Sequence, residues 1–156
     1  MAFERFGRDI RRDVLRHAER EADALGAPAI GAEHLLLGVA LTEGPGHALS
    51  DAGLDAPSVR DALEADLADA LAPLGIPASA VEAVGPPAPT GRRLRLAPAA
   101  KRSLHQALRT ALDRGDRRIH AGHLAIGILR TPSAPVQRLL DRLGVDRDAL
   151  VRALSA

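Results

Sequence analysis

The stretch that decides the fold is IGAEHLLLGV at residues 30–39, because it returns as IHAGHLAIGI at residues 119–128. The two copies lie 89 positions apart and keep isoleucine, alanine, histidine, leucine and glycine in matching places. A second pair follows at residues 48–55 (ALSDAGLD) and 139–146 (LLDRLGVD), 91 positions apart. Self-similarity of this kind indicates a duplicated structural unit. The two extra positions are expected in a loop between helices.

Each unit is predicted to hold four helices. In residues 1–71, apolar residues recur at helical spacing over 10–25, 32–42 and 46–52, and again after Asp55, a plausible N-cap. Glycines end the predicted helices at positions where a left-handed residue is needed. The apolar face of the fourth helix is expected to consist of Val59, Leu63, Leu67 and Leu71. Residues 98–156 repeat the scheme, from Pro98 through a last helix capped by Asp146.

The repeats are joined by a segment, residues 72–97, that contains five prolines and is expected to be a linker with one short helical turn at 78–84. The chain therefore reads as a single all-α domain over 1–156. It is a pseudo-twofold tandem repeat of two four-helix units, about eight helices in all. Its only aromatic residues are Phe3 and Phe6, so the core must be aliphatic, as is typical of a helix bundle.

Composition excludes several classes of function. There is no cysteine, which removes disulfides and thiolate zinc sites and fits a reducing cytoplasm. No apolar run reaches the ~20 residues that a transmembrane helix needs, and the charged N-terminus is not a signal peptide. The sequence has no phosphate-binding G-x-x-x-x-G-K-[ST] motif and no G-x-S-x-G nucleophile elbow. We expect a cytoplasmic protein that is not an enzyme and has no catalytic residues, metal or cofactor.

Charge is unevenly spread although the net charge is only +1. Residues 92–118 hold nine basic residues against two acids, whereas residues 51–69 hold six acids against one arginine. The basic segment allows an alternative function, nucleic-acid binding. No aromatic residue lies within it to stack on bases, so solvated helix faces, some paired between the two repeats, are the preferred interpretation.

The helical duplication with IGAEHLLLG at its second helix resembles the N-terminal domain of Clp ATPases, especially the ClpC type of Gram-positive bacteria. The FERF opening at residues 3–6 and LAPAAKR at residues 96–102 are similar to that family's start of each repeat, with Leu96 in place of phenylalanine. The likeness covers essentially the whole chain. It implies a stand-alone, non-enzymatic module of protein quality control that binds peptides, clients or adaptors of a Clp ATPase, either delivering them or acting as a decoy.

The resemblance also implies binding residues. In the ClpC type, the glutamate of this motif contributes to a phosphoarginine site, which places Glu33 in that role, whereas repeat two has Gly122. At most one such site is therefore expected. The family's surface for adaptors and cyclic peptides maps onto Phe3, Leu96, Lys101, Leu108 and Leu112. Together with Glu33 and His34, these are the ligand-binding candidates.

Both motif residues have a structural alternative. An acid in the first turn, such as Glu33, favours the helix dipole by about 0.3–1 kcal/mol without binding anything. His34 and His123 occupy matching places, and His120 and His123 have a spacing that can hold a metal. Because no cysteine or dependable carboxylate completes such a site, we expect His34 instead to make a local hydrogen bond that fixes the start of its helix.

Overall fold

The structure, a computed structural model, describes residues 5–77, 79, 80, 83 and 90–156. The turn expected at 78–84 lies largely outside these residues, and Phe3 lies wholly outside them. Repeat one contributes a π-helical turn η2 (Asp9–Val14) that continues into α1 (Leu15–Ala24), then α2 (Ala32–Glu43), α3 (Ala48–Asp51), α4 (Ala56–Leu71) and the short 3-10 turn η3 (Ala72–Leu74). Repeat two contributes α6 (Pro98–Asp113), α7 (Ala121–Arg130), α8 (Ala134–Leu143) and α9 (Arg147–Ser155). The described residues thus form eight α-helices, which confirms the expected all-α fold.

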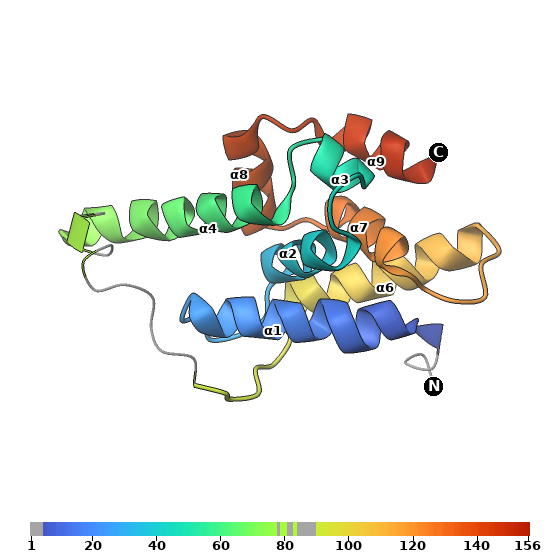
Figure 1. The fold of residues 1–156 in the computed structure, drawn as a ribbon, viewed down its shortest axis with the longest axis horizontal. Helices are drawn as coiled ribbons and strands as arrows, with labels where there is room; N and C mark the ends of the chain where they lie inside the picture. Colours follow the sequence, from blue (N-terminus) through green and yellow to red (C-terminus); the bar gives the residue numbers. More distant parts are fainter. Residues whose placement is uncertain (1–4, 78, 81–82, 84–89) are drawn as a thin grey trace.

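The two repeats pack around a pseudo-twofold relation that is visible in the element contacts. Helices α2 and α7 lie against each other in the middle of the molecule, with α1 and α6 on one side and α3, α4, α8 and α9 on the other (Figure 1). Contacts come in equivalent pairs: α1 packs on α2 as α6 packs on α7, and α4 meets α8 as α9 meets α3. These pairs are what a duplicated four-helix unit predicts.

Each repeat also clasps the other through its backbone. Phe6, just before the first helix of repeat one, forms a backbone bridge with Ile119, just before the second helix of repeat two. In the reciprocal bridge, Leu96 before the first helix of repeat two pairs with Ile30 before the second helix of repeat one. Ile119 donates to the Arg5 carbonyl and Ile30 donates to the Arg95 carbonyl, both at 2.8 Å. Because the two bridges are reciprocal, neither repeat completes its own backbone pairing alone.

Glycines at equivalent places bring helices into close contact. A Cβ atom added at Gly38 in α2 would lie 2.5 Å from the carbonyl oxygen of Val14, and one added at Gly127 in α7 would lie 2.5 Å from the carbonyl oxygen of Ser103. Both distances are far shorter than normal contact. The glycine of the repeated motif is therefore needed for α2 and α7 to approach the first helix of their own repeats.

Helix α4 departs from the expected packing. Val59 and Leu63 are buried, but Leu67 is 39% exposed, because the distal half of α4 extends beyond the body of the molecule (Figure 1). Asp66 in this half accepts from Arg138 of repeat two at 2.8 Å, and Asp69 is paired with Arg142. Part of the acidic charge of residues 51–69 is thus balanced between the repeats, as expected.

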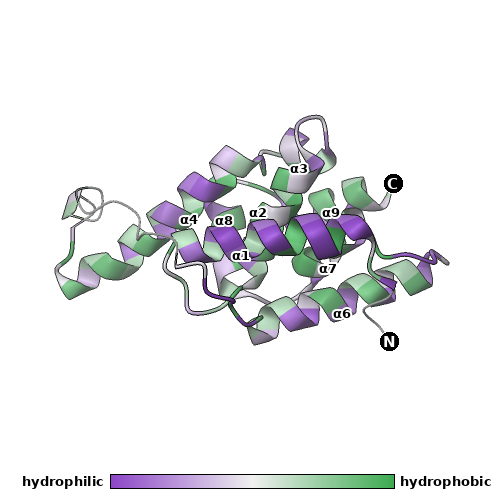
Figure 2. Ribbon diagram, turned by 60° about the horizontal axis from the view of Figure 1, so that its bottom comes forward, coloured by the Kyte–Doolittle hydropathy of each residue, from purple (hydrophilic) through white to green (hydrophobic). Residues whose placement is uncertain are grey.

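The first helix and the central helix α7 differ in polarity. In Figure 2 the exposed side of α1 is mostly hydrophilic, whereas α7 is largely hydrophobic. Ile10, Val14, Ala18 and Ala22 form the buried side of the first helix at the predicted spacing. Within the described residues, no helix combines the length and the apolar character that crossing a membrane requires.

Candidate functional site

The start of α2 is built by His34. Gly31 is the extended residue before the helix, and its N–H donates to His34 Nδ1 at 2.9 Å. Burial lowers the pKa of His34 below its ordinary value of 6.5, against the opposing charges of Glu33 and Glu21. The ring is therefore held neutral, as an acceptor at Nδ1 must be. The prediction that His34 fixes the helix start is confirmed.

Glu33 lies beside this histidine and turns back over the helix start. Its side chain is only 17% exposed, and Oε1 lies 3.7 Å from His34 Nδ1. A Cβ atom placed on Gly31 would lie 2.3 Å from Glu33 Oε2, so the carboxylate occupies the space directly over that glycine. The absence of a side chain on Gly31 thus leaves the room that the Glu33 carboxylate occupies.

The carboxylate lies at a shallow hollow of about 360 Å³ between the two repeats. Its walls come from Gly31 just before α2 and Glu33 within it, from the start of α6, and from residues 132–135 before and within α8. Two lining residues carry charge, Glu33 and Arg102. Arg102 carries no signal of this role in the sequence, because its place in the lining of the hollow depends on how α6 packs across α2.

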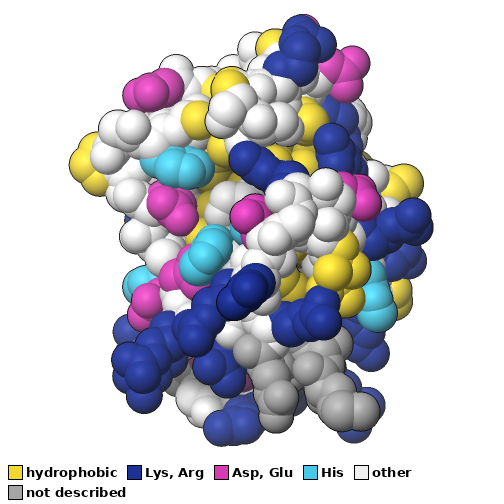
Figure 3. Space-filling model, turned by 90° about the vertical axis from the view of Figure 1, so that its right-hand side faces the viewer, with side chains coloured by type: hydrophobic (Ala, Val, Ile, Leu, Met, Phe, Trp, Pro, Cys, Tyr) yellow, Lys and Arg dark blue, Asp and Glu magenta, His cyan; other side chains and the backbone are white. Residues whose placement is uncertain are grey.

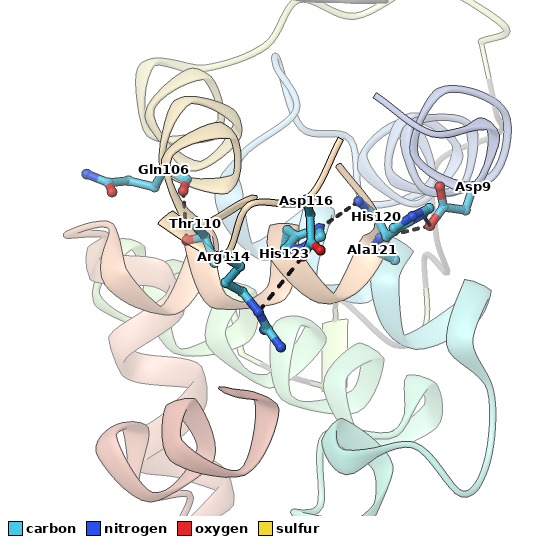
Figure 4. A network of polar contacts seen from close by, with 8 residues as sticks. All are labelled: Asp9, Gln106, Thr110, Arg114, Asp116, His120, Ala121 and His123. Carbon is cyan, nitrogen blue, oxygen red and sulfur yellow. Dashed lines mark hydrogen bonds and ion pairs between the residues drawn. The ribbon is translucent and has the colours of Figure 1, made fainter. Parts of the chain in front are cut away.

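The matching place in repeat two is filled differently (Figure 4). Asp9 of the first helix reaches across, and its Oδ2 atom accepts from the Ala121 N–H at 2.8 Å. His120 Nδ1 lies 3.8 Å from the same oxygen. Gly122 stands where repeat one has Glu33, and a Cβ atom there would meet nothing within 4 Å. The start of α7 therefore holds a carboxylate from the protein itself.

His123 is engaged on both sides of its ring. Nδ1 accepts from the His120 N–H at 2.9 Å, so the ring proton lies on Nε2, which donates to Asp116 Oδ2 at 2.7 Å (Figure 4). This is the structural role of His34 repeated in the second unit. No group of three potential metal ligands suited to an ion is found among the described residues.

The candidates of the expected adaptor surface that can be placed lie along α6. Lys101 and Leu112 are exposed, the latter to 51%, and Leu108 between them is half-buried. Their spacing puts these three side chains on one outward face of the helix. Leu96 is half-buried just before α6, where it pairs with Ile30. This surface is separate from Glu33, and His34 is buried outside both.

No family model matches the chain. The N-terminal domain of the caseinolytic protease associated chaperone ClpD from Arabidopsis thaliana matches with a TM-score of 0.72 at 22% identity, over 99% of this chain and 94% of that chain. The N-terminal domain of Hsp104 from Candida albicans matches with a TM-score of 0.62 at 14% identity, over 91% of this chain and 84% of that one.

A third structure, from an investigation of a malarial protein secretion system, matches with a TM-score of 0.67 at 14% identity, over 97% of this chain and 92% of the other. The three likenesses extend over nearly the whole chain, including both repeats and their junction. They establish that the chain has the fold of Clp-type and Hsp104-type N-terminal domains, which is the fold that the sequence resemblance implied.

Proposed function

We propose that the chain is a non-enzymatic recognition module of Clp-type protein quality control, which binds peptides or proteins as clients or adaptors of a Clp ATPase in the cytoplasm. The observation that carries the proposal is the fold of such N-terminal domains together with an open, charged hollow at the start of α2. A rigid bundle with two separate outer surfaces suits a protein that presents other polypeptides. It acts either by delivering them to the ATPase or by competing for them.

The hollow beside Glu33 is proposed as a phosphoarginine site. A carboxylate accepts two guanidinium N–H groups in a bidentate pair, and Glu33 lines the hollow in the space that Gly31 leaves free. The cation that lines the same hollow, Arg102, provides a partner for the phosphate. One carboxylate and one guanidinium therefore match the two adjoining groups at the tip of a phosphorylated arginine side chain, its guanidinium and its phosphate.

Only repeat one is proposed to bind in this way. Repeat two has no carboxylate at Gly122, and the first N–H of α7 is already bonded to Asp9. A ligand phosphate there would have to displace Asp9 and would meet its negative charge. We expect one phosphoarginine per chain.

Adaptors and cyclic peptides are proposed to bind the α6 surface formed by Lys101, Leu108 and Leu112, together with Leu96. Phe3, which the family resemblance gives the same role, lies outside the described residues. Exposed apolar side chains flanking a cation favour a ligand with its own apolar groups and a carboxylate or carbonyl. Leu112 is half exposed without a covering element among the described residues, which supports a role in contact. Replacing Leu112 with serine should weaken adaptor binding and leave phosphoarginine binding unchanged.

The test is titration calorimetry with free phosphoarginine and a phosphoarginine peptide. Glu33→Gln should weaken binding at least tenfold, because a charge-assisted hydrogen bond contributes about 1.5–3 kcal/mol. Glu43→Gln removes an acid from the other end of the same helix and should bind like the wild type. If Glu33→Gln binds phosphoarginine as tightly as the wild type, Glu33 is not the ligand. A pulldown with a cognate Clp ATPase, with and without client, distinguishes delivery from competition.

Nucleic-acid binding is the second candidate, favoured by the exposure of the basic segment. Of its nine basic residues, all are exposed, and Arg114 has an acidic partner, Asp116 at 3.9 Å. Figure 3 shows basic side chains gathered on the end of the molecule that it faces, interrupted by acidic, histidine and apolar side chains. Gel shifts at low and moderate salt test this function, since phosphate contacts weaken steeply with salt; no retardation at low salt eliminates it.

A further inference from the structure

A second hollow, of about 870 Å³, lies between the first helix and the extended segment that leads into α6. Its rim carries four arginines, and we call it the basic groove: Arg11, Arg12 and Arg16 from the helix, and Arg93 from the extended segment. All four are exposed. Glu33, Lys101, Leu108 and Leu112 do not line it, so the basic groove is distinct from the hollow at Glu33 and shares only Leu96 with the proposed α6 surface.

The wall formed by the extended segment is fixed in place. The N–H groups of Thr90 and Gly91 donate to Asp23 at 2.8 and 3.1 Å, and the Leu94 N–H donates to Glu19 at 2.9 Å. The hydrogen bond from the Thr90 hydroxyl lowers the pKa of Asp23, so this anchor stays ionised over a wide pH range. The groove is therefore preformed, and a ligand need not order its walls.

The charges at the rim are not balanced by the protein. Among the described residues, no ion pair joins Arg11, Arg12, Arg16 or Arg93 to an acid, although other arginines such as Arg60 are paired. Two carboxylates also line the groove, Asp13 and Glu19, but Glu19 is already bonded to the Leu94 N–H. The groove thus has a surplus of positive charge.

The floor between these charges is apolar. Leu15, Leu94 and Leu96 are half-buried and pack against the core, and Ile30 is buried beneath them. An anion without an apolar part would leave this floor in contact with water. A ligand that combines negative charge with an aliphatic side chain satisfies both features.

We propose that the basic groove binds an acidic peptide segment that carries at least one apolar side chain, and that it provides a second contact for clients or adaptors of the function proposed above. Nucleic acid suits it less well, because the described lining has no aromatic side chain for base stacking and includes two carboxylates. The acidic residues of the peptide pair with the rim arginines, and its apolar side chain lies on Leu15 and Leu94.

The experiment uses fluorescence anisotropy of a labelled peptide with two leucines between flanking aspartates and glutamates. The variant Arg12→Gln/Arg93→Gln removes one charge from each wall of the groove. The control Arg109→Gln/Arg118→Gln removes two exposed charges elsewhere and keeps the same net charge. We expect the groove variant to bind about fivefold more weakly or worse, since each exposed pair contributes about 0.5 kcal/mol, and the control to bind within twofold of the wild type.

Two further peptides and one oligonucleotide decide the outcome. A peptide with serines in place of the leucines should bind several-fold more weakly, and one with lysines in place of the acids should not bind. Equal weakening of the two arginine variants, no binding of the acidic peptide at millimolar concentration, or tighter binding of a single-stranded oligonucleotide overturns the proposal. Glu33→Gln should keep full affinity for the acidic peptide, so failure of the phosphoarginine site and failure of the basic groove are distinguishable.

Discussion

Replacing Gly127 with alanine should push α7 away from α6. The new Cβ atom would lie 2.5 Å from the Ser103 carbonyl oxygen and 2.7 Å from the Ala107 amide nitrogen. Normal contact is about 3.5–4.0 Å, so the helices must separate by about 1 Å. Both obstacles are backbone atoms of α6, which no change of rotamer can move. Overpacking of this kind costs about 1–3 kcal/mol.

The same substitution at Gly122, five residues earlier in α7, provides the matched control. Nothing lies within 4 Å of its added Cβ atom. Alanine is a better helix former than glycine by up to about 1 kcal/mol, so Gly122→Ala should be neutral or stabilising. Because both variants gain helix propensity, the difference between them isolates the clash. At about 2–4 °C per kcal/mol for a domain of this size, the two melting temperatures should differ by about 2–12 °C.

Thermal unfolding followed by circular dichroism, with urea unfolding as the second measurement, tests this prediction. Gly127→Ala should have the lower melting temperature and the lower urea midpoint. An unchanged urea slope will show that both variants expose the same surface area on unfolding, so that their midpoints can be compared. If Gly127→Ala is as stable as Gly122→Ala, α7 does not approach α6 as closely as described, and the explanation of the repeated glycine is wrong.

Three other perturbations test the helix starts. His34→Gln keeps an acceptor for the helix start but does not titrate. Because folding lowers the pKa of His34 below its ordinary value of 6.5, the stability that the neutral ring contributes is full above pH 6.5 and is lost as the pH falls below it. In urea unfolding, the variant should therefore lose less stability than the wild type between pH 7 and 5. Gly31→Ala should displace the Glu33 carboxylate and weaken phosphoarginine binding in calorimetry, with stability changed by about 0.5 kcal/mol or less. Asp9→Ala removes the carboxylate that accepts from Ala121 and should lower the free energy of unfolding by about 1 kcal/mol, measured by urea unfolding.

The histidine and aspartate substitutions each have a matched control in the chain. His105→Gln replaces an exposed histidine of α6 and should keep the pH dependence of the wild type. Asp13→Ala removes an exposed acid one turn after Asp9 and should change stability little. A wild-type pH profile in His34→Gln, unchanged phosphoarginine affinity in Gly31→Ala, or equal stability of the two aspartate variants contradicts the corresponding prediction.

The sequence was sufficient for the fold because the pattern that specifies it occurs twice. Apolar spacing located the helices, and Asp55 and Asp146 cap α4 and α9 as predicted, each accepting from the backbone three residues later. The local hydrogen bond of His34 was also predictable, because it joins residues three positions apart. Features that depend on a few neighbouring residues can therefore be predicted from the sequence.

Features that depend on packing between the repeats were missed. The apolar spacing of α4 suggested a continuous buried face, but burial of Leu67 requires a neighbour that repeat two does not extend far enough to provide. Arg102 in the hollow and Asp9 at the start of α7 were missed for a related reason. Their partners are distant in sequence. The matching positions of the two repeats also carry different residues, so comparing the repeats did not indicate a role for either side chain.

These differences show how the duplicated unit has become asymmetric at the place where function is proposed. Both repeats begin their second helix with a histidine that bonds to the backbone three residues before it. In repeat one the adjoining space holds Glu33 and opens to the hollow, whereas in repeat two it holds Gly122 and the carboxylate of Asp9. Asp9 comes from the opposite repeat, so it stabilises the junction of the two units at the position that matches the proposed phosphoarginine site. The start of α7 has thereby become part of the scaffold, and the start of α2 remains available for recognition.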